Sequence, residues 1–575
     1  MENVEQTKPN PIVKFFSDIT TKKAILIISI LGIIVFGNSL ANGFVGDDAS
    51  QLAANPDFQS ITNVGAFFSG AILPNDIYYK PIFNTFNAFI LTIFGPSSIA
   101  FHSFSILLHL VVLVFLFLVL SHFFNKPLSL VLALVFLVHP INSEVVYYIS
   151  DLQDSLFMFF GLLGLYKLIK AKSTGSIILV TFLLFLSVLS KETGALFFPL
   201  AIIYSLVFNR KYLYQLIGLL GFAGLMYLAL RMNAIGIYSY PALAPIADLT
   251  LAERLLHIPA ILFFYIKTFF FPIDVSSSYN WVIKSITVAN FYLPLLVSLI
   301  AISGVIFFGI KFYKRTNPSH FKHYIFFGLW LAIGLMLHLQ VIPLDATVAD
   351  RWFYLPMGGA LGIVGTLFQA YNINFNHKYI LTSTLIILTL LSARTIIRSF
   401  DWRNGLTLYT HDIEVSNSYV LYNALGSELF RLKRLDEARH YITKSIEIYP
   451  SFINYSNLGT VFAYEKDYIK AKESYLKALE FGDSSLVYEN LSFLLIGMEN
   501  DLNETNLFIQ SALKKYPNNS LLWFSAAIME YKLEDLVAAE YAIRRAYDLN
   551  HRPDIKQLYD VIKSGKLGVE FNILP

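Results

Sequence analysis

Two adjacent aspartates, Asp47 and Asp48, are the first residues along the chain that could carry out chemistry. They lie in the stretch FVGDDASQL, directly after the first long apolar run. Two neighbouring carboxylates repel each other, so at a membrane surface the pKa of one of them should rise. Such a carboxylate suits a general base, and the pair could also ligate a divalent metal such as Mg²⁺ or Mn²⁺. The structural alternative is a solvated loop or a helix N-cap.

Further polar residues lie at the ends of later apolar runs, where they could serve the same site. Basic side chains among them would suit a lipid-linked phosphate. Taken singly, each has a plain structural interpretation: Lys191 would pair with Glu192, and Arg231 and Arg351 would reach lipid headgroups. Two histidines one helical face apart, His102 and His109, are interpreted as packing or cap residues and are left out of the site. The residues that remain are Lys80, His139, Glu144, Lys191, Glu192, Arg231, Asp350 and Arg351.

Several other chemistries find no support in the sequence. The chain has no cysteine, which excludes disulfides, thiolate nucleophiles and cysteine metal sites. It contains no glycine-rich phosphate loop, no HExxH or GxSxG motif and no kinase motif set. A nucleotide-driven or protease mechanism is therefore not indicated, and the nearly even balance of 43 Lys+Arg against 40 Asp+Glu does not point to nucleic acid.

The elements that must position these residues are transmembrane helices. The chain has 575 residues, of which 55% are hydrophobic and 14% charged, with a mean hydropathy of +0.57. A chain so long and apolar needs a bilayer as solvent. Twelve apolar segments are long enough to consider, and the first is interpreted as an uncleaved helix rather than a signal peptide. They lie near 24–41, 98–121, 128–147, 153–170, 176–190, 194–208, 212–231, 251–271, 291–311, 324–342, 356–373 and 379–397.

The distribution of lysine and arginine orients these segments, because cytoplasmic loops carry an excess of both. Clusters at the N-terminus, at 167–172, at 210–211 and at 311–322 are assigned to the inside. The assignments from the two ends agree only if one segment, for which 251–271 is the first candidate, does not cross. We therefore expect roughly 11 spans. An odd number leaves the C-terminal domain outside, on the same face as the loop that holds Asp47 and Asp48.

The chain divides into a membrane domain, 1–400, and a polar domain, 401–575, in which a period of about 34 residues recurs. Leu425-Gly426 and Leu458-Gly459 begin successive units, and small residues and prolines follow in register. This pattern is typical of tetratricopeptide repeats, and four units fit 419–553, the third being the weakest. Such repeats form a curved α-solenoid that commonly binds an extended peptide. A spacer or an oligomerisation module is the alternative.

The order of motifs resembles a known family. The acidic pair is followed by YYKPIFNTFNAFI, LVFLVHPINSEVVYYISDLQDSLFMFFGLLGLY, VLSKETGALFFPLAIIY, IKTFFFPIDVSSSYNW and VADRWFYLP, and the repeats come last. This arrangement is similar to that of the transmembrane and tetratricopeptide-repeat-containing O-mannosyltransferases and their prokaryotic relatives, within the GT-C superfamily of membrane glycosyltransferases. The chain departs from the family pattern at Lys80, where Arg is usual, and at Asp350, where Glu is usual.

The resemblance implies a reaction and a role for each residue. Such enzymes transfer a sugar, for which mannose is the first candidate here, from a polyprenyl-phosphate carrier to an acceptor hydroxyl, often of a protein Ser or Thr. Asp47 would be the general base, and Asp48 would orient the acceptor or assist. The residues that would hold the donor phosphate are Lys80, Lys191, Arg231 and Arg351. Those that would form the site wall or support it are His139, Glu144, Glu192 and Asp350.

No cofactor is required by this scheme beyond the lipid-linked donor, although a divalent metal on Asp47 and Asp48 is compatible with it. The expected partners are the donor lipid, membrane lipid and an acceptor protein or peptide held by the repeats. The short repeat array favours the outer face of a prokaryotic plasma membrane, with the lumen of the endoplasmic reticulum as the counterpart in a eukaryote. Two other functions remain open: a non-catalytic scaffold that recruits partners through its repeats, and a flippase for lipid-linked sugars.

Overall fold

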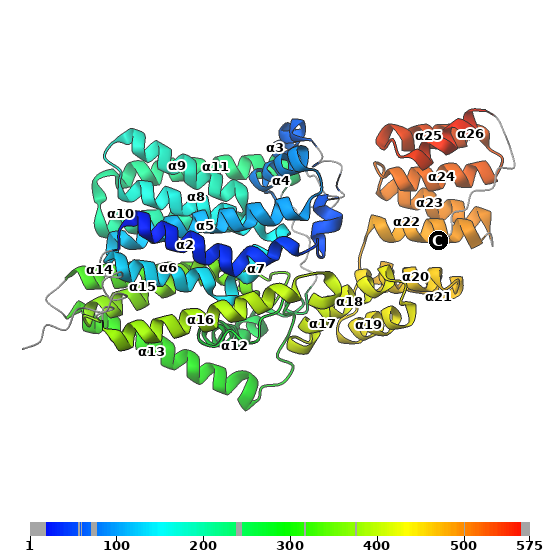
Figure 1. The fold of residues 1–575 in the computed structure, drawn as a ribbon. Coiled ribbons are helices and arrows are strands. Elements are labelled where there is room, and N and C mark those ends of the chain that lie inside the picture. The colour runs from blue at the N-terminus through cyan, green and yellow to red at the C-terminus, as the bar shows by residue number, and fades with distance from the viewer. Residues whose placement is uncertain are drawn as a thin grey trace, which may run out of the picture. The chain divides into compact units, whose positions relative to one another are not determined.

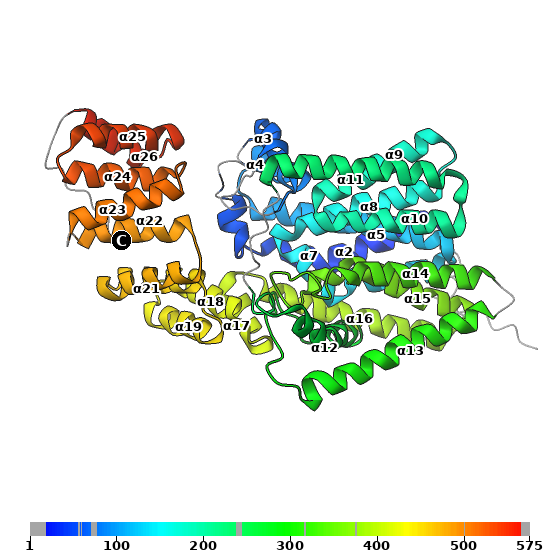
Figure 2. The same cartoon turned by 180° about the vertical axis from the view of Figure 1, so that it is seen from behind.

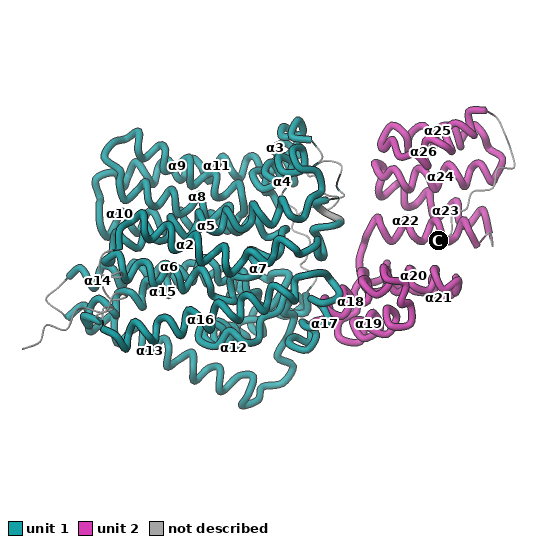
Figure 3. Tube along the Cα trace, in the orientation of Figure 1, with its two compact units in different colours: residues 1–417 teal, residues 418–575 magenta. Residues whose placement is uncertain are grey.

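The computed structural model describes residues 19–53, 55, 58, 60–70, 78–236, 244–314, 318–373, 377–498 and 501–564. Within these ranges the chain is helical, and the only strand-like pairing is an isolated bridge between Tyr279 and Val348. The chain forms two compact units, Met1–Asn417 and Ser418–Pro575 (Figures 1 and 3). The boundary therefore falls 17 residues beyond position 400, because the helix at Gly405–Val415 belongs to the first unit.

The first unit is a bundle of long helices that lie side by side, as both views show (Figures 1 and 2). Each of the twelve predicted apolar segments contains a helix, although the helix in 324–342 ends at Met336 and the segment 128–147 is interrupted at His139. The helices of the unit are α2 (Thr21–Phe36), α3 (Val64–Ser69), α4 (Pro81–Phe94), α5 (Ser98–Phe123), α6 (Lys126–Val138), α7 (Ser143–Tyr147), α8 (Leu152–Ile169), α9 (Thr174–Ser190), α10 (Phe197–Phe208), α11 (Leu213–Ile235), α12 (Leu251–Phe270), α13 (Leu293–Tyr313), α14 (Pro318–Met336), α15 (Tyr354–Ala370), α16 (Lys378–Asp401) and α17 (Gly405–Val415).

Seven helices in the described part of the chain are long and apolar enough to cross a membrane. They include α2, α5, α8, α11, α13, α15 and α16, and an eighth span arises if α6 and the segment Pro140–Tyr147, bent by 57° against each other, count as one. Three shorter apolar segments, α4, α9 and Glu192–Phe208, belong to the same unit. The protein is thus an integral membrane protein of many helices. The segment predicted not to cross, 251–271, forms α12 and is not among the long apolar helices of the described chain.

Close helix packing in the bundle depends on glycines where two helices meet. A Cβ added at Gly359 of α15 would lie 2.4 Å from the backbone nitrogen of Leu331 in α14. At Gly362, one turn further along α15, it would lie 1.9 Å from the ring of Phe327. Lipid tails are as apolar as the helices, so no hydrophobic effect drives the helices together inside a bilayer. Small residues instead let two helix backbones approach closely enough to pack against each other. The pair α14–α15 in turn positions the turn that precedes α15, which carries Asp350 and Arg351.

The second unit contains paired antiparallel helices, as the repeat period predicts. The pairs are α18 (Tyr419–Arg431) with α19 (Leu435–Ile448), α20 (Phe452–Tyr464) with α21 (Tyr468–Phe481), α22 (Ser485–Met498) with α23 (Leu502–Lys515), and α24 (Ser520–Lys532) with α25 (Leu536–Leu549); α26 (Pro553–Lys563) follows. Small residues lie at the crossings: Gly426 faces Ile442, and Ala438, Ala471 and Ala539 are fully buried. The predicted α-solenoid is confirmed as the fold of this unit.

The contact at Gly359 gives a stability test. We expect Gly359→Ala to lower the apparent Tm of the purified protein, because the added methyl group forces α14 and α15 apart at a cost of roughly 1–3 kcal/mol. Gly304→Ala in α13 is the matched control, since a Cβ there has nothing within 4 Å. The Tm of that control should be unchanged or slightly higher. Equal melting of the two variants would show that this helix contact does not depend on glycine.

Candidate functional site

Asp48 is held rigidly by the protein. It lies at the start of the short helical turn Asp48–Ala53, after the turn at Gly46, whose φ is +57°. The side chain is buried, and its Oδ1 accepts hydrogen bonds from the backbone nitrogen of Ser150 at 2.8 Å and from the Ser150 hydroxyl at 2.7 Å. Oδ2 accepts a further bond from the backbone nitrogen of Val45 at 3.3 Å. Burial raises the pKa of Asp48 to about 7, although the bonds from Ser150 and Val45 lower it.

Asp47 is the more accessible of the two carboxylates. Its side chain keeps contact with solvent, while the surrounding protein excludes enough water to raise the pKa of its carboxyl group. A hydrogen bond from Tyr148 and the positive charges of Lys80 and Arg351 act in the opposite direction. Asp47 therefore combines access to a substrate with a raised pKa, the two properties that a general base needs.

Arg351 is fixed by carboxylates from a distant part of the chain. Its Nη1 lies 2.5 Å from Oε1 of Glu144, and its backbone nitrogen donates to Oε2 of the same side chain at 3.1 Å. Its Nε lies 3.6 Å from Oδ2 of Asp151. The Arg351 side chain remains 19% exposed, whereas the side chains of Glu144 and Asp151 are each only 5% exposed. The acidic groups thus lie behind the cation, and the cation keeps the accessible position.

Lys191 has the same arrangement. Its Nζ lies 2.6 Å from Oδ2 of Asp154, with exposures of 20% for the lysine and 2% for the aspartate. Arg231 pairs instead with Glu192, at 2.9 Å, and Glu192 also accepts a bond from Tyr227. The alternative pairing of Lys191 with Glu192 is therefore wrong. Arg231 and Arg351 are both held by protein carboxylates, so lipid headgroups are not needed to explain them.

Lys80 lies at the N-cap of α4 and is half-buried. Its Nζ is 5.5 Å from the centroid of the Tyr78 ring and 4.9 Å from that of Phe83, distances at which a cation is attracted to an aromatic face. Because its charge lowers the pKa of Asp47, Lys80 and Asp47 belong to the same neighbourhood.

Two predicted wall residues are engaged in holding loops. His139 accepts a bond from the backbone nitrogen of Ile141 at Nδ1 and reaches the carbonyl oxygen of Phe269 at 3.0 Å through Nε2, so it ties the end of α6 to the end of α12. Asp350 is buried and accepts a hydrogen bond of 3.4 Å from Tyr279. Because Asp350 is next to Arg351 in the chain, its bond with Tyr279 supports the turn that carries Arg351.

Sequence reasoning missed Asp151 and Asp154, which support Arg351 and Lys191. Both lie in the quoted stretch YYISDLQDSLF, where two acidic residues open a long apolar helix. Acidic residues inside a membrane segment normally have a partner or a function, and this signal could have identified them. Asp151 is also the N-cap of α8 but makes no side-chain capping bond, so its carboxylate turns toward Arg351 instead.

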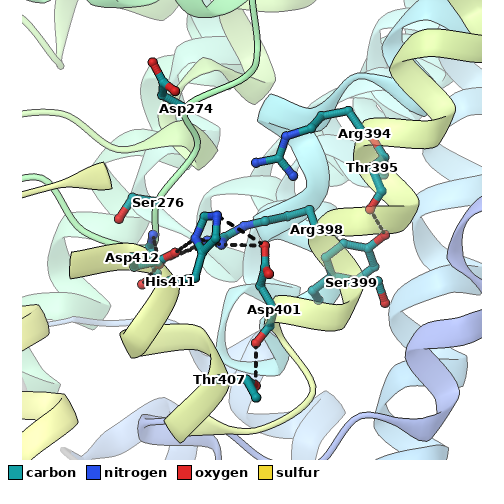
Figure 4. Close-up of polar contacts among 12 residues, drawn as sticks. Asp274, Ser276, Arg394, Thr395, Arg398, Ser399, Asp401, Thr407, His411 and Asp412 are labelled. Atoms are coloured by element: carbon teal, nitrogen blue, oxygen red, sulfur yellow. Dashed lines mark hydrogen bonds and ion pairs between the residues drawn. The ribbon is translucent and has the colours of Figure 1, made fainter. Parts of the chain in front are cut away.

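A second buried ion pair joins α16, α17 and the segment that follows α12 (Figure 4). Arg398 of α16 donates to both oxygens of Asp412 of α17, at 2.7 and 3.0 Å. Asp412 also accepts two bonds of 2.7 Å from the backbone nitrogen and hydroxyl of Ser277. Although burial acts to raise it, the pKa of Asp412 is lowered by Arg398 and by the bonds from His411 and Ser277.

The clamp formed by Arg398, Asp412 and Ser277 connects to Arg351 through a short chain of hydrogen bonds. The backbone nitrogen of Ser276, beside Ser277, donates to the hydroxyl of Tyr279 at 2.6 Å, and that hydroxyl donates to Asp350, the neighbour of Arg351. The backbone of Tyr279 also accepts a bond of 2.9 Å from Thr347. The two loops predicted to lie outside, 272–290 and 343–355, are thus fastened to each other.

Within the residues that the structure describes, no group of three or more His, Asp and Glu side chains could hold a metal ion. Both oxygens of Asp48 already accept hydrogen bonds, which leaves Asp47 as the carboxylate of the pair that is open to a ligand.

Comparison with known proteins adds family relationships to this geometry. The model of the dolichyl-phosphate-mannose-protein mannosyltransferase family matches residues 80–235, and a tetratricopeptide repeat model matches residues 419–452. The protein O-mannosyl-transferase F38B6.6 of Caenorhabditis elegans is 26% identical over 431 residues, or 70% of this chain. The chain is thus similar, over part of its length, to proteins named as protein O-mannosyl-transferases. The family resemblance predicted from the motifs is confirmed.

Other relatives match shorter parts. The mouse protein O-mannosyl-transferase TMTC3 is 28% identical over 34% of this chain and 23% of its own length, and human TMTC1 is 30% identical over 30% and 22%. The chain spans 60% of the length of the worm relative. Among solved structures, the repeat protein YrrB is 19% identical over 27% of this chain and 82% of its own, with a TM-score of 0.24, which is too low to compare the two folds.

The clamp yields a prediction about stability. We expect Arg398→Met to cost about 3–5 kcal/mol, because it leaves the buried carboxylate of Asp412 without its cation. The matched control is Arg431→Met, whose pair with Glu428 is exposed and contributes at most about 1 kcal/mol. Thermal unfolding of both variants in the same detergent measures the difference. If Arg398→Met melts at the temperature of the control, the pair of Arg398 with Asp412 does not stabilise the protein.

Proposed function

We propose that this protein is a membrane glycosyltransferase that moves a sugar, mannose in the first instance, from a polyprenyl-phosphate carrier to the hydroxyl group of a protein Ser or Thr on the non-cytoplasmic face. The observation that carries the proposal is the position of Asp47, a solvent-accessible carboxylate whose pKa responds to two cations, Lys80 and Arg351. A base beside cations is what the transfer of a sugar from a phosphate requires. The names of the relatives support mannose as the sugar and protein as the acceptor.

In the proposed reaction, Asp47 accepts the proton of the acceptor hydroxyl as the oxygen forms a bond to the anomeric carbon. The bond between that carbon and the phosphate oxygen breaks, and its electron pair leaves with the polyprenyl phosphate. Negative charge therefore develops on the phosphate, where Arg351, Lys191 and Lys80 would stabilise it. No acid is needed, because phosphate is a good leaving group.

The pairing of the cations supports this role. A cation that had to be ordered when the donor arrives would lose binding energy to conformational entropy. Glu144 and Asp154 hold Arg351 and Lys191 from the buried side, so both are ordered before a ligand arrives. Asp48 plays a similar part for the loop: its three hydrogen bonds fix the backbone from which Asp47 extends.

The repeats supply a place for the acceptor. Helical repeats of this kind commonly bind extended peptides, and the family relationship implies a protein acceptor. We propose that the second unit binds the acceptor polypeptide and raises its concentration near Asp47. A divalent metal, if one is needed, would bind at Asp47.

Replacement of the base tests the enzyme function. We expect Asp47→Asn to lower the rate of sugar transfer roughly 100-fold or more, because the amide cannot accept the proton. The assay combines the purified protein with labelled polyprenyl-phosphate mannose and a Ser/Thr-rich peptide, and the product is identified by its mass.

The control for Asp47→Asn is Asp274→Asn, which removes an exposed carboxylate of an outer loop that pairs with Lys267. Its transfer rate should be that of the wild type. Unchanged transfer in Asp47→Asn would refute the proposed base. If the protein moved intact lipid-linked sugar across vesicle membranes without transferring it, the protein would instead be a flippase. If it showed neither activity, it would be a scaffold.

Donor binding tests the role of the cations. We expect Lys80→Gln to weaken the binding of polyprenyl phosphate roughly tenfold or more, because a contact between opposite charges is lost. Lys267→Gln is the matched control, since Lys267 is half exposed and pairs with Asp274. Titration of detergent-solubilised protein with a short-chain polyprenyl phosphate gives both dissociation constants. Equal dissociation constants for the two variants would show that Lys80 does not bind the phosphate.

A further inference from the structure

Three polar side chains form a connected group on the first helices of the first two repeats. The amide nitrogen of Asn457 in α20 lies 3.0 Å from Oδ1 of Asn423 and 3.2 Å from Oγ of Ser427, both of which belong to α18. The Ser427 hydroxyl itself donates to the backbone carbonyl oxygen of Asn423, at 3.0 Å. All three residues are partly exposed, so the group lies at the surface of the second unit.

These contacts fix the orientation of both amide groups. A hydroxyl has one hydrogen, and the hydrogen of Ser427 is used by the backbone carbonyl, so the group that faces its oxygen must be a donor. The amide nitrogen of Asn457 therefore points toward α18 and uses its two hydrogens on Asn423 and Ser427. Within the part of the chain that the structure describes, the side-chain oxygen of Asn457 and the amide nitrogen of Asn423 make no further hydrogen bond, and both atoms are open to solvent.

The acceptor and the donor that remain match a peptide unit, which offers one N–H group and one C=O group. A peptide N–H can donate to Oδ1 of Asn457 while a peptide carbonyl accepts from Nδ2 of Asn423. Main-chain contacts of this kind bind an extended chain without reading its side chains. They suit a polypeptide whose sequence varies from one bound protein to the next.

An aromatic pair lies on the same face of the two helices. Phe430 and Tyr464 each follow the asparagine of their own helix by two helical turns, and both are partly exposed. Their ring centroids are 5.5 Å apart, and Lys433 holds the Tyr464 hydroxyl through a bond of 2.7 Å from its Nζ. The rings lie about 10 Å along the helix axes from the amides, which is about three residues of an extended peptide. A side chain of the bound peptide can therefore pack there.

We propose that Asn423 and Asn457 form a binding site for the backbone of an extended polypeptide, and that Phe430 and Tyr464 contact a side chain of the same segment. The inference rests on the proposed function only for the identity of this polypeptide as the acceptor, because binding can be measured without catalysis. It assigns peptide binding to the first two repeats, which follow the membrane domain directly in the chain.

Binding of a fluorescent peptide to the full-length protein in detergent tests the site. The peptide contains Ser, Thr, Ala and Val but no proline, and its Kd is measured by fluorescence anisotropy without any donor lipid. We expect Asn457→Ala to raise the Kd roughly tenfold, because the peptide loses one hydrogen bond and the amide of Asn423 loses its orientation. Asn423→Ala removes the donor and should raise the Kd by a similar factor.

The matched control is Asn503→Ala, which removes an exposed asparagine side chain from the first turn of α23. Its Kd should equal that of the wild type. Thermal unfolding checks that each variant is folded, which we expect because the side chains removed are partly or fully exposed. Equal dissociation constants for Asn457→Ala and Asn503→Ala would overturn the inference.

A change in the peptide tests the same contact on the wild-type protein, where no variant can misfold. A peptide of the same sequence with every backbone nitrogen methylated has no N–H for Asn457 to accept, so it should bind roughly tenfold more weakly. A peptide of scrambled sequence keeps all its peptide units and should bind about as tightly as the parent. Equally tight binding of the methylated peptide would contradict recognition through the backbone.

The transfer assay separates this inference from the proposed function. Asn423→Ala and Asn457→Ala should raise the KM for the peptide and leave kcat unchanged, because they remove binding and not a reacting group. A lower kcat with an unchanged KM would contradict the inference. Absence of transfer in the wild type would refute the proposed function instead, while the dissociation constants would still decide whether the two asparagines bind a peptide.

Discussion

Pairing of charge at low dielectric is the constraint on which the end of the bundle that carries Asp48 and Arg351 depends. A cation at the rim of an apolar bundle is costly unless a carboxylate accompanies it, and each partner removed leaves the other uncompensated. The pair of Arg351 with Glu144 satisfies this constraint and at the same time joins the turn before α15 to α7. The same contacts therefore fix the loops and place the charges in this protein.

In each ion pair, the difference in burial between the two groups determines which one a ligand can reach. In the pairs of Arg351 and Lys191 the carboxylate is more deeply buried than the cation, so the positive group remains accessible. Ser150 supports the negative side of the site, because it donates two hydrogen bonds to Asp48, the residue next to Asp47. A carboxylate and several cations are thus held in place by protein contacts that exist before any ligand binds. This arrangement fits a reaction in which a proton leaves one substrate and negative charge develops on the other.

Sequence reasoning predicted the helices well because their signals are local. Each apolar segment and each repeat is recognised from residues that lie within a few dozen positions of one another. Each of them contains a helix in the structure. Ion pairs were not predictable in the same way, because Arg351 and Glu144 are 207 residues apart and meet only through the tertiary fold. The expected pair of Lys191 with Glu192 failed for a local reason: Lys191 has extended backbone angles, which direct successive side chains apart. The roles of the ten candidate site residues remain predictions.

The central claim is that Asp47 lies on the non-cytoplasmic face, on the same side as the repeats. Cysteine accessibility measures this most directly, since the natural chain contains no cysteine and single substitutions need no altered background. Three single variants, Ala49→Cys, Asn550→Cys and Lys172→Cys, would be exposed to a membrane-impermeant maleimide in sealed right-side-out vesicles. We expect labelling of Ala49→Cys and Asn550→Cys in intact vesicles, and of Lys172→Cys only after permeabilisation. Protection of Ala49→Cys in intact vesicles, or its labelling from the face opposite to Asn550→Cys, would contradict the account.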